Sequence, residues 1–272
     1  MPEGWVDDHD AAGLLRADFQ VWDDPAVDWS AYDRVVLRSV WDYSWRLEEF
    51  LAWCRVVGPT ALRNGPELVA FNANKRYLAD ISVPTVPTSF IAPGDALPSV
   101  DGEIVVKPNI SAGARDTGRF ASAASAIALI DEIHASGRVA LVQPYLSSVG
   151  LRGETSVVFI GGEISHFLAK RAVLREEGTA PVANGQLRVA AAMLEEDLVV
   201  AGTADPAQIS LAEAAHAELS ERFGTPLYAR IDLVQDDDGN PVVSELEAIE
   251  PCLYLGTAGG ASERLAAAVR AS

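Results

Sequence analysis

Apolar positions recur along the chain with the period of a strand in some stretches and of a helix in others, which predicts a mixed α/β fold. Residues 34–38 form an apolar run after a polar turn and predict a buried strand. The pattern over 45–57 is helical and ends at Gly58 and Pro59, and a second helical segment begins near Asn72. Further along, we expect strands over 103–107 and 139–143 around a helix over 121–135, a strand pair over 155–160 and 163–170 joined at Gly161 and Gly162, a helix over 211–223 capped by Ser210, a hairpin over 227–234 and 241–247, and a last helix over 262–271.

Three subdomains are expected from this order of elements. Before residue 34 only the piece 19–22 resembles a strand, and the opening residues read as loop, so the usual first strand of an α/β subdomain is expected to be missing. The proline-rich segment 83–97 predicts an extended crossing between units, and the pattern weakens over 171–205. We therefore expect an N-terminal α/β unit over 1–72, a central unit over 73–145 and a C-terminal unit over 146–272.

The composition of the 272 residues, 49% of them hydrophobic, is that of a globular protein. No run of about 18 apolar residues occurs, and the acidic start does not resemble a signal peptide, so we expect a soluble, cytoplasmic protein that does not bind membranes. A net charge of -18 without a basic patch opposes nucleic acid binding. Cys54 and Cys252 form no CxxC pair, and the four histidines share no metal-ligand spacing.

Lysine is rare in this chain. Only three of the 21 basic residues are lysines, at positions 75, 107 and 170, and the rest are arginines. A lysine ammonium is a compact point charge that suits a phosphate group. The three lysines are therefore candidates for phosphate binding, although chance survival in an arginine-rich chain explains the count equally well.

The predicted hairpin near the C-terminus carries a pattern of charges. Arg230 and Asp232 alternate with apolar residues on one strand, and Glu245 and Glu247 do so on the other. Because side chains alternate across a strand, three carboxylates and one arginine can share a face. Such a group of carboxylates needs a cation, and Mg²⁺ prefers oxygen ligands. The alternative is a set of solvent-facing charges on a polar sheet face.

Two further segments suggest nucleotide binding. Lys107 ends a strand, and the loop of small residues after it can offer backbone N–H groups to phosphate oxygens. It matches neither the P-loop nor the GxGxxG pattern, and such a loop alone also fits an ordinary turn. The strand ending at Gln143–Leu146 offers edge backbone groups to a flat base.

Taken in order, these motifs resemble the ATP-grasp superfamily over about residues 70–256. The segments that carry the resemblance are NKRYLADI, VVKPNISAGARDTGRF, VQPYL, GETSVVFIGGEISHFLAK, ARIDLV and SELEAIEP. Within the superfamily the chain is similar to the glutathione-synthetase-like branch, and most similar to the cyclo-ligases that close the isoxazolidinone ring in cycloserine biosynthesis. The resemblance implies an N-terminal α/β subdomain followed by two α+β subdomains that clamp ATP.

The resemblance also implies a role for each matching residue. Arg230 and Arg188 would be catalytic, and Asp232, Glu245 and Glu247 would hold Mg²⁺. Arg38, Asp42 and Tyr43 would bind the acceptor substrate, although packing of aromatic side chains at a strand end explains that motif equally well. The expected ATP-binding residues are Lys75, Lys107, Ser111, Ala112, Gly113, Ala114, Gln143, Pro144, Tyr145, Leu146, Glu154 and Lys170.

The activity implied is an ATP- and Mg²⁺-dependent ligation of a small-molecule carboxylate to an amine through an acyl phosphate, within one amino-acid derivative. The alternatives are ligation between two amino acids or peptides, and a nucleotide-binding regulatory protein without catalysis. Thr155 stands where relatives often have Arg, and a Gly-Gly turn that should follow Arg188 is missing. Many relatives are dimers, so a homodimer is a further expectation.

Overall fold

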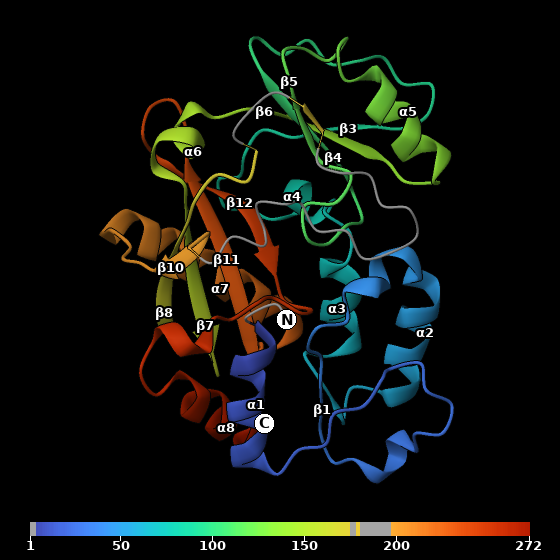
Figure 1. Ribbon diagram of the computed structural model, residues 1–272, viewed down its shortest axis with the longest axis vertical. Coiled ribbons are helices and arrows are strands. Elements are labelled where there is room, and N and C mark those ends of the chain that lie inside the picture. The colour runs from blue at the N-terminus through green and yellow to red at the C-terminus, as the bar shows by residue number, and fades with distance from the viewer. Residues whose placement is uncertain (1–3, 175–177, 180–196) are drawn as a thin grey trace.

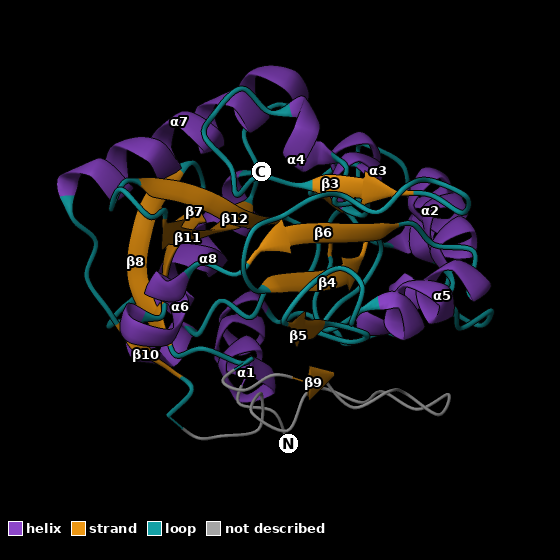
Figure 2. Cartoon of the chain, turned by 90° about the horizontal axis from the view of Figure 1, so that it is seen from above, coloured by secondary structure: helices purple, strands orange, loops and turns teal. Residues whose placement is uncertain are grey.

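Two five-stranded antiparallel sheets organise the chain, and the computed structural model describes residues 4–174, 178–179 and 197–272. One sheet belongs to the C-terminal half and the other to the middle of the chain, as Figures 1 and 2 show. The C-terminal sheet has the order β10-β8-β7-β11-β12, with β7 at Glu154–Ile160, β8 at Glu163–Lys170, β10 at Val199–Ala201, β11 at Tyr228–Gln235 and β12 at Pro241–Glu247. The central sheet has the order β3-β6-β4-β5-β9, with β3 at Ser89–Ile91, β4 at Ile104–Pro108, β5 at Gly118–Phe120, β6 at Ala140–Pro144 and β9 at Gly178–Thr179.

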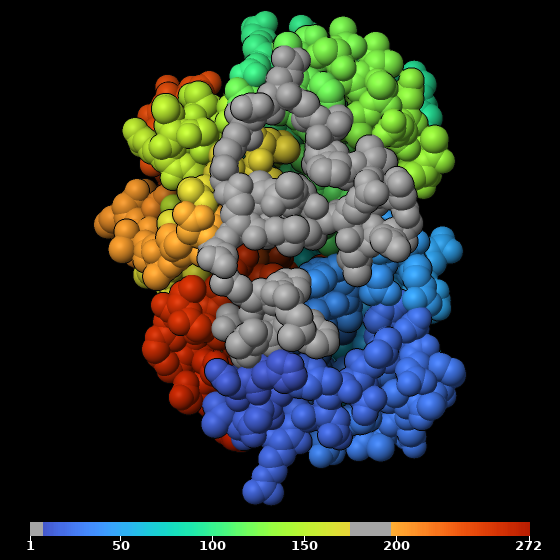
Figure 3. Space-filling view, viewed as in Figure 1, coloured from blue at the N-terminus to red at the C-terminus, as the bar shows by residue number. Residues whose placement is uncertain are grey.

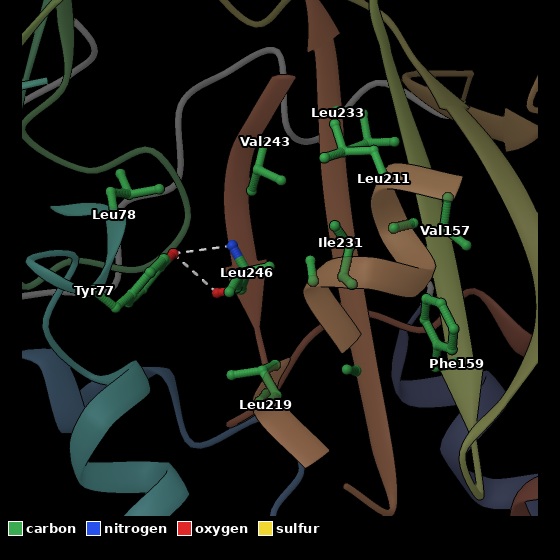
Figure 4. Close-up of a cluster of buried hydrophobic side chains, with 14 of the residues drawn as sticks. Tyr77, Leu78, Val157, Phe159, Leu211, Leu219, Ile231, Leu233, Val243 and Leu246 are labelled. Carbon is green, nitrogen blue, oxygen red and sulfur yellow. Dashed lines mark hydrogen bonds between the residues drawn. The ribbon is translucent and has the colours of Figure 1, made fainter. Parts of the chain in front are cut away.

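The two faces of the C-terminal sheet carry different side chains. Ile231 and Leu233 of β11 point to one face, where they pack with Leu211 and Leu219 of helix α7, Pro206–Phe223 (Figure 4). Alternation along a strand sends Arg230 and Asp232 to the other face. The apolar side chains of the predicted alternation are thus buried under a helix, and the charged side chains lie on the opposite face of the sheet.

Helix α7 begins five residues before the predicted start. Asp205, not Ser210, is the N-cap: its side chain accepts from the backbone N–H of Gln208, whose side chain accepts from that of Asp205. Pro206 occupies the first helical position, where its missing N–H costs nothing. The prediction of a start at 211 was wrong because the capping box that forms is Asp205 with Gln208, five residues before the similar Ser210 and Glu213 pattern.

The central sheet is covered by one helix. Helix α5, Ile127–Ala135, packs Leu129, Ile130 and Ile133 onto Val106 and Val142 of the sheet. The helix was predicted from residue 121, but 121–126 form a turn in which Ser122 and Ser125 exchange hydrogen bonds. Serine side chains that bond to nearby backbone favour turns over helix interiors.

The N-terminal region differs most from the prediction. Residues Gly4–Leu15 form helix α1 instead of a loop, and 19–22 is not a strand. Helix α1 lies beside the C-terminal helix α8, Ala261–Ala271 (Figures 1 and 3). Ala11 joins Leu265 and Val269 in a buried cluster. The sequence pattern of α1 is too weak to predict this helix, which is stabilised by contacts with a segment distant in sequence.

The first strand in the described residues is β1, only Val35–Val36, parallel to β2 at Leu62–Arg63. Aromatic residues supply the core around it. The ring centroids of Trp22, Phe50 and Trp53 lie within 6 Å of one another. The remaining elements here are the 3₁₀ turns η1 at Trp29–Ala31 and η2 at Trp41–Trp45, helix α2 at Leu47–Val57, helix α3 at Pro66–Asn72 and helix α4 at Tyr77–Asp80, while α6 at Ser147–Arg152 and the 3₁₀ turn η4 at Leu255–Thr257 lie in the C-terminal half.

Candidate active site

A cavity of about 700 Å³ lies between the two sheets and is lined from the N-terminal region as well. Its size is in the ordinary range for small-molecule sites. The walls come from β4, β6, β7, β8, β11 and β12, from the loop after β4, and from η2. All three lysines of the chain line it, together with Arg230, Glu245 and Glu247 of the β11–β12 hairpin.

The hairpin brings its charges together as the alternation predicts. Arg230 is paired in register with Glu247, and Asp232 with Glu245. The Arg230 guanidinium donates to both carboxylate oxygens of Asp232, at 2.8 and 2.9 Å, and to Oε1 of Glu247 at 2.5 Å. Asp232 is fully buried, so this bidentate pairing supplies the countercharge that it requires.

The electrostatics of the hairpin separate its two glutamates. Burial opposes ionisation of Glu245, but Lys75 and Lys107 outweigh it and lower the pKa of this carboxyl to about 2. Burial raises the pKa of Glu247 to about 7, in spite of the attraction of Arg230. The two lysines thus favour the ionised form of Glu245, whereas burial opposes ionisation of Glu247 although Arg230 is its partner.

The chemistry of these donors fits Mg²⁺ in part. Mg²⁺ usually binds one or two protein carboxylates together with substrate phosphates. Glu245 and Glu247 lie on the same face of β12 and suit that role, whereas both oxygens of Asp232 accept from Arg230. No group of three or more His, Cys, Asp or Glu side chains close enough for a metal ion occurs in the described part of the chain.

The three lysines differ in their contacts. Lys75 forms an ion pair with Glu245 at 2.7 Å and donates to the carbonyl of Ser111 at 3.0 Å. Lys170 lies opposite Glu154 in the sheet, with Nζ 3.4 Å from its carboxylate. Lys107 has no ion pair in the described residues, and burial lowers its pKa against the opposing effect of Glu245. A partly buried ammonium without a carboxylate partner favours an anionic ligand.

The loop after β4 forms one wall. Ser111 is buried, and Gly113 and Ala114 both have positive φ, at 64° and 53°. Successive backbone N–H groups in such a turn can form a concavity that binds phosphate. The backbone at Ala114 is strained for a residue with a side chain, as is frequent at functional loops.

The segment Gln143–Leu146 also lines the cavity. The side chain of Gln143 donates to Thr88, and the backbone N–H of Tyr145 donates to the carbonyl of Glu103 at 2.8 Å. Arg119 stacks on the Tyr145 ring at 3.6 Å. This N–H is already used, so contacts between the segment and an adenine would come from its other backbone groups.

Only one of the three residues expected to bind the acceptor substrate lies in the cavity wall. Tyr43 lines it. Arg38 instead pairs with Asp8 at 2.9 Å, and Asp42 accepts from Trp22 Nε1 at 3.2 Å and lies 3.6 Å from Arg46. Helix α1, which the sequence pattern does not predict, supplies the partner of Arg38. Arg188 lies outside the described residues.

Two charged residues of the cavity were not singled out from the sequence. Arg115 follows the small-residue loop and is 1% exposed, and Glu250 lies three residues after Glu247. Both stand within the segments quoted above, but an arginine in an arginine-rich chain and a glutamate after two others carry little signal.

Cys54 and Cys252 are free thiols, and no described helix is both long and apolar enough to span a bilayer.

Comparison with known proteins identifies close relatives. Residues 4–64 match the family model for the N-terminal domain of D-cycloserine synthetase DcsG. The chain is 37% identical over 258 residues to the cycloserine biosynthesis protein DcsG of Streptomyces lavendulae, a match that covers 89% of this chain and 83% of the relative. The crystal structure of D-cycloserine synthetase DcsG superposes with a TM-score of 0.84 at 32% identity, covering 97% of this chain and 93% of that one.

A more distant structure shares the fold. D-alanine–D-alanine ligase from Bacillus anthracis, complexed with ATP, superposes with a TM-score of 0.64 at 11% identity over 98% of this chain and 91% of that one. The expected ATP-grasp fold is thus confirmed. The charged hairpin, the lysines and these matches together show that the chain belongs to the DcsG family of ATP-grasp ligases, enzymes that use ATP to form C–N bonds.

Proposed function

We propose that this protein uses ATP and Mg²⁺ to activate the carboxylate of a small amino-acid derivative as an acyl phosphate and then closes a ring by joining it to a nitrogen of the same molecule. The observation that carries the proposal is the gathering of three lysines and the Arg230–Asp232–Glu245–Glu247 hairpin around one cavity. Positioning and charge neutralisation are what phosphoryl transfer requires of a protein.

The lysines and the loop after β4 would bind the phosphates. Lys107 has no ion pair with a carboxylate among the described residues, and the N–H groups around Gly113 can donate to phosphate oxygens. Lys75 donates to the carbonyl of Ser111 in this loop, and its ammonium would also attract the phosphates. The nucleoside would lie against Gln143–Leu146, with Glu154 at the ribose and Lys170 paired beside it.

Glu245 and Glu247, with Asp232 behind them, would hold Mg²⁺. The ion when bound neutralises phosphate oxygens and orients them. Arg230 points from β11 into the same site, fixed by Asp232 and by the Cys252 carbonyl at 3.0 Å. Its guanidinium would stabilise negative charge on the transferring phosphoryl group and then on the acyl carbonyl.

In the first step a carboxylate oxygen would attack the γ-phosphorus and ADP would leave. In the second step the nitrogen would attack the acyl carbon, phosphate would leave, and the nitrogen would lose a proton. The cavity walls would exclude water, which would otherwise hydrolyse the acyl phosphate. Arg188 is a second proposed catalytic residue beside Arg230, as the resemblance implies.

Ring closure is favoured over ligation of two molecules by the relatives, which are named as D-cycloserine synthetases. Opening the C–N bond of the cycloserine ring gives a D-serine derivative with a nitrogen on its side-chain oxygen. Ligation between two amino acids is the second candidate, because the D-alanine–D-alanine ligases share the fold. Homodimerisation is a further proposal that does not bear on this chemistry.

The test is a screen for substrate-dependent ADP release with D-serine derivatives of this kind, and with pairs of D-amino acids. We expect ADP release with a single D-serine derivative. The product should be lighter than that derivative by one water, because ring closure transfers a carboxylate oxygen to phosphate. ADP release only with amino-acid pairs, and a product that contains both, would replace ring closure by intermolecular ligation. ATP binding without release for any of them would favour the regulatory alternative.

A further inference from the structure

Besides Lys107, which is assigned to phosphate, two opposite charges in the cavity have no oppositely charged partner in the described parts of the chain. They are the guanidinium of Arg115 and the carboxylate of Glu250. The other carboxylates of the cavity are paired: Glu154 with Lys170, Glu245 with Lys75, and Glu247 with Arg230. The two unpaired groups therefore need an explanation that the phosphate chemistry does not supply.

Arg115 is almost completely buried. Its guanidinium lies 3.7 Å over the ring of Trp45, and Nη1 donates to Ser44 Oγ at 2.9 Å. Its Nε has no hydrogen-bond partner, and the neighbouring Asp116 is committed to Arg138 at 2.6 Å. A buried cation without an anion is costly, so the site is completed best by an anionic group of a ligand.

Glu250 presents the opposite case. It lines the cavity beyond the end of β12, with no hydrogen bond or ion pair to a described residue. Burial, followed by the repulsion of Glu247, raises its pKa to about 8. A carboxyl in such surroundings ionises when a cation is placed beside it.

Both groups line the same cavity as Tyr43 of η2. Ser44 and Trp45 of the same turn hold the Arg115 guanidinium. The two groups therefore face one cavity whose wall includes η2. The loop that carries Arg115 also carries Ser111, the residue held by Lys75, so an anion on Arg115 lies on the phosphate side.

We propose that Arg115 and Glu250 form a clamp for a zwitterionic α-amino acid, in which Glu250 accepts hydrogen bonds from the α-ammonium group and Arg115 binds the carboxylate. The clamp rests on the proposed function and narrows its substrate to molecules whose α-amino group is free and protonated. The bound carboxylate then lies toward the loop after β4 that would bind the phosphates.

The test is calorimetric binding to the full chain in the presence of Mg²⁺ and a non-hydrolysable ATP analogue. The probes are D-serine and two analogues that each lack one of its charges. D-glycerate has a hydroxyl in place of the ammonium, and D-serinamide lacks the carboxylate. We expect D-serine to bind at least about tenfold more tightly than either analogue, as the loss of one charged hydrogen bond predicts.

Two variants separate the two ends of the clamp. Glu250→Gln should abolish the preference over D-glycerate and leave the preference over D-serinamide. Arg115→Met, which keeps the apolar stack on Trp45, should do the reverse. Glu221→Gln, an exposed glutamate of α7, is the matched control and should change neither.

Wild-type protein that does not bind D-serine, or that binds it no better than D-glycerate, would overturn the clamp, as would Glu250→Gln protein with the full preference. If Arg115→Met fails to fold, the wild-type comparison and Glu250→Gln still decide. Selective D-serine binding without any ring closure would refute the proposed function and leave the clamp, and ring closure that is indifferent to Glu250 would do the opposite.

Discussion

Single residues at this site are understood through their charged partners. Arg230 holds Asp232 with two hydrogen bonds and Glu247 with a third, so one guanidinium neutralises carboxylates from both strands of the hairpin. Lys75 forms the ion pair that neutralises Glu245. Lys107 is the exception, because no described carboxylate lies within ion-pair distance of its ammonium.

Lys107→Ala tests the free ammonium. We expect its affinity for ATP in the presence of Mg²⁺ to fall by at least about tenfold, because a charge-assisted contact with phosphate is lost. Calorimetry measures this directly. Arg55→Ala, which removes an exposed cation of α2, is the control for a general change in charge, and equal affinity for wild type and Lys107→Ala would remove Lys107 from the ATP site.

Glu250 has a consequence for stability as well. Its pKa is raised from 4.5 to about 8, so between these pH values the folded state holds a proton that the unfolded state has released. The free energy of unfolding of the ligand-free protein therefore falls as pH rises through this window. Glu250→Gln removes that loss and should melt at a higher temperature than wild type at pH 8, with little difference at pH 4.

Thermal melts of both proteins across this range provide the measurement. The exposed Glu221→Gln should follow the wild-type curve throughout. A Glu250→Gln variant that is less stable than wild type at pH 8 would show that the carboxylate is ionised and satisfied in the folded protein.

At the scale of elements, strand β12 is held in place by two short helices. Tyr77 of α4 donates to the carbonyl of Leu246 and accepts from its N–H, both at 3.0 Å (Figure 4). Asn72 at the end of α3 bonds to Leu246 and Ala248. These contacts satisfy the free edge of the strand that carries Glu245 and Glu247, and they fix where the carboxylates point.

Gly153 shows how closely another pair of elements approaches. It ends α6 with φ of 75°, and a Cβ there would lie 2.2 Å from the carbonyl oxygen of Lys170. We expect Gly153→Ala to lower the free energy of unfolding by about 2 kcal/mol or more, because both the backbone conformation and the contact are unfavourable. It should also weaken ATP binding by shifting Glu154 and Lys170.

Gly13→Ala is the matched control for denaturant unfolding. It lies in helix α1, and no atom is within 4 Å of a Cβ added there. Alanine is favoured over glycine in a helix, so this variant should gain about 0.5–1 kcal/mol. Equal stability of Gly153→Ala and wild type would show that the α6–β7 junction is looser than described.

At the scale of the whole molecule, one buried side chain joins the N-terminal region to the C-terminal sheet. Asn64 donates to the carbonyls of Tyr228 and Ala248 and accepts from the N–H of Leu227. Asn64→Ala leaves these groups unpaired, and we expect a loss of about 2–4 kcal/mol in the free energy of unfolding. Urea unfolding measures the loss, with the exposed Gln20→Ala as control. A loss below that of the control would contradict this role.

Much of the sheet structure and half of the site follow from the sequence. Strands β4, β6, β7, β8, β11 and β12 follow the predicted ranges within one or two residues, because alternation and turn residues are local signals. The same alternation placed Arg230, Asp232, Glu245 and Glu247 on one face. Helix α1, the pairing of Arg38 with Asp8, and the place of Arg115 and Glu250 in the cavity wall depend on contacts between distant segments, which local patterns do not record.

The central claim, that a substrate carboxylate is activated by ATP, is tested most directly by following the carboxylate oxygen. A D-serine derivative that supports ADP release would be labelled with oxygen-18 in its carboxylate, and the phosphate released would be analysed by mass spectrometry. Attack of the carboxylate on the γ-phosphorus and later loss of phosphate must leave one labelled oxygen in each phosphate formed. Phosphate without label, released along with the product, would contradict the acyl phosphate and the mechanism built on this site.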